Sequence, residues 1–161
     1  MRRAKECRKC FSKQAGLTLL ELIISCAILL ILSSAALPIA RYSSLRMKEA
    51  NLRFALRSMR EGIDRYKDAA DHNQIKTEIG SEGYPPDLET MVKGVPLGST
   101  SDKRIRFLRA IPTDPITGRK DWQLYSVQDP PDATKWNGKN VFDVRSTSHD
   151  TALDGTKYSD W

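Results

Sequence analysis

The feature that most constrains this chain is a run of 24 residues, Leu17–Ala40, in which every side chain is apolar or small except one carboxylate, Glu21. As an α-helix this run would be about 36 Å long, enough to cross a hydrocarbon core of about 30 Å. Residues 1–16 before it carry a net charge of +5. Because basic residues stay on the cytoplasmic side, the pattern predicts a single-pass membrane protein with a cytoplasmic N-terminus.

Two other kinds of N-terminal segment compete with a membrane helix. A secretory signal peptide has an apolar region of about 7 to 15 residues followed by small residues, which residues 33–36 would supply. A lipoprotein signal would place a lipid on Cys26, although the apolar stretch before it is short and contains Glu21. Both alternatives remain open, and the length of the run favours the membrane helix.

Glu21 is the unusual residue of the run. A central acidic residue costs about 2.5 to 3.5 kcal/mol on insertion scales, and a carboxylate inside a membrane helix therefore indicates a function. The alternative is a charge near the interface that simply reaches water.

The residues around this carboxylate, "GLTLLE" at 16–21, resemble the cleavage signature of type IV prepilins and type II secretion pseudopilins. The resemblance implies that a prepilin peptidase cuts between Gly16 and Leu17 and that Leu17 is then N-methylated. Leu17 departs from the phenylalanine that is usual in the family. Leu17, Thr18 and Glu21 would take part in assembly, with Glu21 pairing with the new amine of a neighbouring subunit. Pro38 would kink the helix.

The charge of the chain argues against nucleic acid as a partner. The net charge is +6 in the whole chain and only +1 after residue 16, so the folded part has no basic excess of the kind that nucleic-acid binding needs. Cys7 and Cys10 form a lone CxxC without the second ligand pair that zinc requires. No cysteine follows Cys26, so no disulfide forms in the rest of the chain.

Beyond the apolar run the pattern continues as a helix. Apolar residues recur at spacings of seven, four, three, four and three, and form a stripe of Leu45, Leu52, Leu56, Met59, Ile63 and Tyr66. This stripe predicts one helix over residues 17–71, with an amphipathic second half that covers a sheet. Charged residues occupy the other faces. Among them, Glu49 and Arg53 have the favourable i,i+4 spacing.

From His72 onward the sequence predicts loops and short elements. A short helix is expected over 87–93, and the basic stretch 103–110 is expected to be a solvated surface. The short strands are expected over 122–127, 141–145 and 158–161. Together these elements predict an α+β fold, in which a long helix packs its amphipathic half on a small antiparallel sheet.

The expected organisation has four parts: a leader (1–16), a transmembrane helix (17–40), its amphipathic continuation (41–71) and a periplasmic globular part (72–161). In the last part, "FLRAIPTDPITGRKDWQLYS" and "FDVRSTSHDTALDGTKYSDW" resemble major pseudopilins of type II secretion. The resemblance implies a homo-oligomeric helical filament, anchored in the inner membrane, that helps drive folded proteins across the outer membrane. Its implied partners are minor pseudopilins, the prepilin peptidase, the inner-membrane secretion platform and membrane lipid.

Two further functions remain as alternatives. A type IV pilus subunit for adhesion, motility or DNA uptake is the nearer one, although many pilins carry a C-terminal cysteine pair that this chain lacks. A membrane-anchored periplasmic enzyme is the more distant one. His72 and His149 lie in loop-like stretches, and no Gly-rich phosphate loop accompanies them, so no enzymatic activity is expected.

The resemblance also implies calcium in the C-terminal loop. Calcium takes about six to eight oxygen ligands. Five residues within twelve positions of this loop carry carboxylate or hydroxyl oxygens: Asp143, Ser146, Ser148, Asp150 and Asp154. Asp150 and Asp154 are the first candidates. The alternative is a turn that is closed by its own side-chain hydrogen bonds, with Leu153 and Trp161 packed beneath it.

Overall fold

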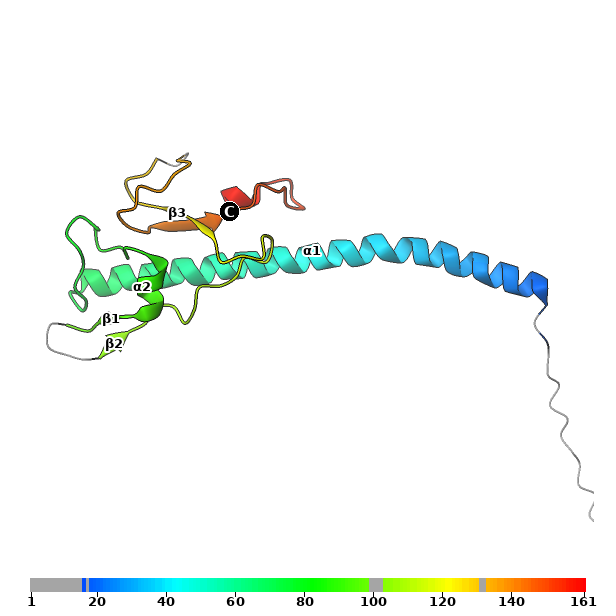
Figure 1. Cartoon of the computed structure of the whole chain (residues 1–161), viewed down its shortest axis with the longest axis horizontal. Coiled ribbons are helices and arrows are strands. Elements are labelled where there is room, and N and C mark those ends of the chain that lie inside the picture. Colours follow the sequence, from blue (N-terminus) through cyan, green and yellow to red (C-terminus); the bar gives the residue numbers. More distant parts are fainter. Residues whose placement is uncertain (1–15, 17, 99–102, 131–132) are drawn as a thin grey trace, which may run out of the picture. The chain divides into compact units, whose positions relative to one another are not determined.

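The computed structural model describes residues 16, 18–98, 103–130 and 133–161, with residues 35–38 described only as part of a helix. The chain divides into two compact units, Met1–Tyr42 and Ser43–Trp161. The long helix α1, Leu19–Asp71, belongs to both units (Figure 1). The predicted helix over 17–71 is therefore confirmed, with its start at Leu19.

In the first unit, α1 is apolar on every side. Its described leucine and isoleucine side chains between Leu19 and Ile39 are all more than half exposed, because no other described residue of this unit covers them. Among the described residues, α1 is the one helix that is long and apolar enough to cross a membrane. Its apolar surface is therefore available to lipid or to the helices of other subunits.

In the second unit, α1 is amphipathic, as the stripe predicts. Leu52, Leu56, Met59, Ile63 and Tyr66 are at most 2 % exposed and form the centre of the core. Leu45, at the start of the stripe, is only half-buried. The amphipathic half of α1 is therefore the surface on which the rest of this unit is assembled.

The short helix α2, Leu88–Lys93, confirms the helix expected at 87–93 and is capped at both ends. The Asp87 carboxylate accepts a hydrogen bond from the Thr90 N–H at its start, as an N-cap residue does. At its end, Gly94 has a φ of 83°, and a Cβ there would lie 2.8 Å from the carbonyl oxygen of Ile105. Leu88 and Met91 turn into the core beside α1.

Two antiparallel strand pairs complete the unit, where a single sheet was expected. Strand β1, Val95–Pro96, pairs with β2, Arg104–Ile105. Strand β3, Trp122–Tyr125, pairs with β4, Asp143–Ser146. The strands β3 and β4 confirm two of the three expected strands.

The stretch 103–110 differs from the solvated surface that its charges predict. It contains β2, and Phe107 and Leu108 are buried in the core. Their backbone N–H groups donate to the Met91 carbonyl at the end of α2 (3.0 and 3.1 Å). The basic residues on either side of this pair, Arg106 and Arg109, do stay exposed.

The third expected strand, 158–161, is wrong. Residues Tyr158–Asp160 form a single 3₁₀ turn, η1. The Tyr158 and Trp161 rings pack edge to face, with centroids 5.1 Å apart, and this contact between residues three apart requires a turn, because a strand would separate them. The α+β class itself is confirmed, since a long helix carries small antiparallel sheets.

Candidate functional site

Thr18 and Glu21 begin α1 together. The Thr18 hydroxyl accepts a hydrogen bond from the Glu21 N–H (3.2 Å), and the Thr18 carbonyl accepts from the Leu22 N–H (3.1 Å). Thr18 therefore occupies the N-cap position and Glu21 the third helical position, which is the spacing of a capping box. The hydroxyl of Thr18 therefore caps the start of α1 through the backbone N–H of Glu21, which gives Thr18 a role of its own.

The Glu21 carboxylate lies exposed at the N-terminal end of the apolar helix. Within the part of the chain that the structure describes, it makes no side-chain hydrogen bond or ion pair. The N-terminal end of a helix also favours a negative charge through the helix dipole. The carboxylate therefore lies open to solvent, where a cation from outside this segment could pair with it.

The structure does not test several predictions about the N-terminal segment. Leu17 and the leader, residues 1–15, lie outside the described residues, so the cleavage and methylation remain predictions. Gly16 is exposed, and a Cβ added to it would meet open space. The helix α1 continues through Pro38, and the kink at this residue also remains a prediction.

Glu49 connects α1 to the C-terminal loop, which the sequence did not predict. Its Oε1 accepts hydrogen bonds from the Leu153 N–H (2.7 Å) and from the Tyr158 hydroxyl (3.0 Å). Glu49 is 8 % exposed and Tyr158 1 %. Burial, followed by the hydrogen bond to Glu49, raises the pKa of Tyr158 to about 12. Glu49 and Arg53, although spaced i,i+4, form no ion pair in the described structure, and each has a partner in the loop instead.

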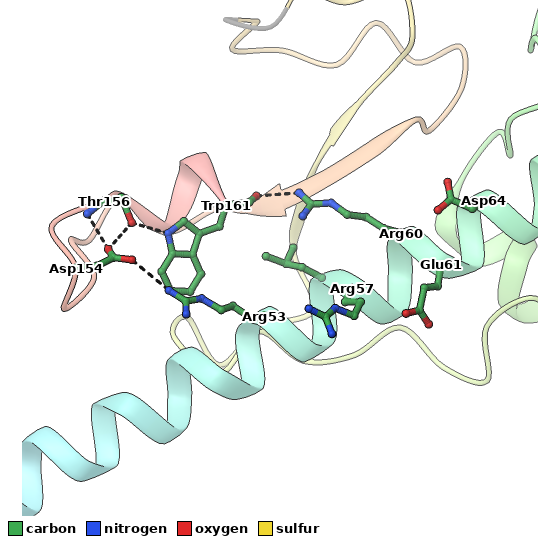
Figure 2. A pocket seen from close by; sticks show the side chains of 9 residues that line it. Arg53, Arg57, Arg60, Glu61, Asp64, Asp154, Thr156 and Trp161 are labelled. Carbon is green, nitrogen blue, oxygen red and sulfur yellow. Dashed lines mark hydrogen bonds and ion pairs between the residues drawn. The ribbon is translucent and has the colours of Figure 1, made fainter.

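Two arginines of α1 bind the same segment. Arg53 forms an ion pair with Asp154 (3.2 Å), and its guanidinium lies 4.2 Å from the centre of the Trp161 ring. Arg60 forms an ion pair with Asp143 (2.6 Å) and donates to the carbonyl oxygens of Val144 and Trp161, both at 3.0 Å. Figure 2 shows Arg53 at Asp154 and Arg60 at Trp161. The C-terminal segment is therefore bound along one face of the helix.

An open pocket of about 530 Å³ lies between this face and the C-terminal segment (Figure 2). It contains cations, acids and one aromatic ring, and its lining residues are Arg53, Leu56, Arg57, Arg60, Glu61, Asp64, Asp154, Thr156 and Trp161. Hydrogen bonds from Thr156, aided by the charge of Arg53, lower the pKa of Asp154. Arg53 and Asp154 therefore neutralise each other within the pocket, while Arg60 pairs with Asp143 outside it.

The five oxygen-bearing residues expected to bind calcium do not converge in the structure. Asp143 and Asp154 bind arginines of α1. Ser146 donates to Asp114 (2.6 Å), and the Ser148 hydroxyl donates to Asp150 (3.3 Å). Among the described residues, no group of three or more His, Cys, Asp or Glu side chains is placed to hold a metal ion. These residues therefore do not fit a calcium site as they are arranged here.

Asp114 organises the turn before β3, in the stretch "PTDP" at residues 112–115. Its Oδ1 accepts from the Ile116 N–H (2.7 Å), and its Oδ2 accepts from the buried Ser146 hydroxyl of β4 (2.6 Å). Asp114 is fully buried. The Pro-x-Asp-Pro turn therefore has a structural role, which is to join its loop to β4.

Comparison with known proteins bears on the N-terminal segment. The family model described as the prokaryotic N-terminal methylation motif matches residues 11–37. This match supports the type IV pilin-like class. The class includes pilins and pseudopilins, whose members are structural subunits that a prepilin peptidase processes and that assemble into filaments. Comparison with curated proteins and with solved structures gives no match.

Proposed function

We propose that this chain is the structural subunit of a type II secretion pseudopilus, a periplasmic filament that helps drive folded proteins across the outer membrane. The observation that carries the proposal is the methylation motif at residues 11–37 on an apolar helix whose Glu21 carboxylate is exposed. A membrane helix with a free carboxylate at this point is costly in a monomer. Assembly with other copies removes that cost.

The chemistry of assembly follows from the proposed cleavage. Cutting after Gly16 would create a positive amine on Leu17, near the edge of the bilayer. The Glu21 carboxylate of a neighbouring subunit would then pair with it, and two desolvated charges would be compensated only in the filament. The uncovered apolar side chains of α1 would pack against the helices of neighbouring subunits. Glu21 would therefore set which subunits are neighbours and in what register.

The proposed location is the inner membrane, with a single pass, a cytoplasmic N-terminus and the second unit in the periplasm. The apolar helix together with the methylation motif supports this location, and the basic residues 1–16 support the orientation. The partners in this proposal are minor pseudopilins, the prepilin peptidase, the inner-membrane secretion platform and membrane lipid.

Two sequence features favour a pseudopilus over a pilus. The globular part contains no cysteine, so it cannot form the C-terminal disulfide of many pilins. Its "PTDP" turn, where Asp114 accepts a hydrogen bond from Ser146 of β4, resembles the Pro-x-Asp-Pro turn of major pseudopilins. A type IV pilus subunit for adhesion, motility or DNA uptake remains the alternative, since the methylation motif is common to both.

Deletion of the gene separates these two functions. For a pseudopilus we expect loss of secreted enzymes from the culture medium, while surface pili and twitching motility are unchanged. Complementation with the intact gene should restore secretion. Loss of twitching with normal secretion would instead assign the chain to a pilus.

A further inference from the structure

The C-terminal loop, which was expected to bind calcium through its oxygens, presents hydrogen-bond donors to α1. A calcium site needs about six to eight oxygens directed at one point. Here the Leu153 N–H and the Tyr158 O–H are directed at the Glu49 carboxylate, at 2.7 and 3.0 Å. Hydrogen-bond donors require an acceptor, which a carboxylate is and a metal ion is not.

Three backbone carbonyl oxygens of the loop already accept hydrogen bonds. The Asp150 carbonyl accepts from the Tyr158 N–H (3.1 Å), the Ala152 carbonyl from the Gly155 N–H (3.0 Å), and the Thr156 carbonyl from the Ala152 N–H (2.8 Å). A cation would have to compete with these bonds for its carbonyl ligands. The loop is closed by its own backbone instead.

The nearby carboxylates are neutralised by cations that belong to the protein. Arg53 lies 3.2 Å from Asp154, and Arg60 lies 2.6 Å from Asp143. Arg145 is a second guanidinium near Asp143, at 3.6 Å. A divalent cation at either carboxylate would have to displace a guanidinium and would be repelled by those that remain.

We propose that Glu49, Arg53 and Arg60, here called the α1 clamp, hold the C-terminal segment 148–161 in place without calcium. The three residues reach the loop backbone, the Asp154 carboxylate and the Trp161 carbonyl. Each contact joins residues about a hundred positions apart, as a disulfide or a metal site does in other small domains. This inference concerns the folding of the second unit and does not rest on the proposed secretion function.

The first test needs no substitution. The full chain, purified in detergent, is unfolded by heat in millimolar calcium or in chelator, and the midpoint Tm is followed by circular dichroism. Identical Tm values are expected, because the clamp already satisfies the loop. A rise in Tm that depends on calcium would overturn the proposal.

The second test compares two arginines of the same helix. Arg60→Met removes the contacts to Asp143, Val144 and Trp161, and Arg57→Met is the matched control. Arg57 lines the same pocket and has no hydrogen bond or ion pair among the described residues. We expect Arg60→Met to lower Tm by several degrees, with or without calcium, and Arg57→Met to leave it unchanged. Equal effects of the two, or recovery of Arg60→Met by calcium, would contradict the clamp.

A milder variant keeps the test decisive if Arg60→Met does not fold. Glu49→Gln preserves the side-chain volume and removes the negative charge that accepts both loop donors. Hydrogen exchange of the Leu153 amide should become at least several-fold faster, because exchange reports local opening, and calcium should not slow it. Unchanged exchange at this amide would refute the role of Glu49.

Discussion

At the scale of single residues, Glu21 is the clearest target, because it is the one charged residue between Gly16 and Ala40. Glu21→Ala makes the helix more apolar, so insertion into the membrane should persist. Leaving a desolvated amine without its partner costs about 3 to 5 kcal/mol. Filaments, seen by electron microscopy, should therefore be lost while the protein stays in the membrane fraction.

Ser25→Ala is the control for that experiment. Ser25 lies one turn further along α1, and its hydroxyl bonds only to the Glu21 carbonyl in the described structure (2.7 Å). Its removal should leave filaments intact. Normal filaments from Glu21→Ala would show that the carboxylate has no part in assembly.

Tyr158 makes stability depend on pH in the alkaline range. Its pKa is raised from 10.0 to about 12 in the folded protein, so the unfolded chain loses this proton first. The stabilisation is therefore complete below about pH 10 and is lost as the pH rises through about 12. A shift of this size corresponds to roughly 2 to 3 kcal/mol in the free energy of unfolding. Denaturant melts across this pH range measure it.

Tyr158→Phe isolates this contribution. The variant should be less stable by about 1 kcal/mol at neutral pH, since it loses one hydrogen bond to Glu49. Its stability should fall less steeply than that of the wild type between pH 10 and 12. If the free energy of unfolding depends on pH in the same way in both proteins, the pKa of Tyr158 is not raised.

At the scale of elements, the amphipathic half of α1 carries the core of the second unit. Ile63 is fully buried and Phe54, on the same helix, is 74 % exposed. Ile63→Ala should lower the free energy of unfolding by about 2 to 5 kcal/mol, because it removes buried methyl groups and leaves a cavity. Phe54→Ala should change it by less than about 0.5 kcal/mol, as surface substitutions usually do. Equal losses in denaturant melts would contradict this orientation of the helix.

At the scale of the whole molecule, the mature protein should begin at Leu17. The motivation is the basic leader that ends in Gly16 before the apolar helix, within the matched methylation motif. Removing the leader lowers the net charge of the chain from +6 to +1. Mass spectrometry of the protein from its native membrane should therefore find an N-methylated Leu17. A lipid on Cys26, or an N-terminus near residue 36, would instead support one of the other two kinds of signal.

Sequence patterns predicted the elements that are specified by residues close together in the chain. The length of α1 follows from an apolar run and a stripe that a helix alone can satisfy, and α2 follows from Asp87 as its cap. The strands β3 and β4 were predicted nearly in place. The strands β1 and β2 were missed, because each is only two residues long and depends on its partner. The turn at Tyr158 was mistaken for a strand, because an aromatic-rich end is typical of both.

The sequence by itself determined the apolar helix, its carboxylate and its N-terminal methylation motif, since all of these lie within about thirty consecutive residues. Tertiary structure alone decided what holds the C-terminal loop. Glu49 meets Tyr158 across 109 positions and Arg60 meets Trp161 across 101, and no local pattern indicates such pairs. Two of the carboxylates that suggest calcium in the sequence, Asp143 and Asp154, bind arginines in the fold, because burying the stripe of α1 brings those arginines to them.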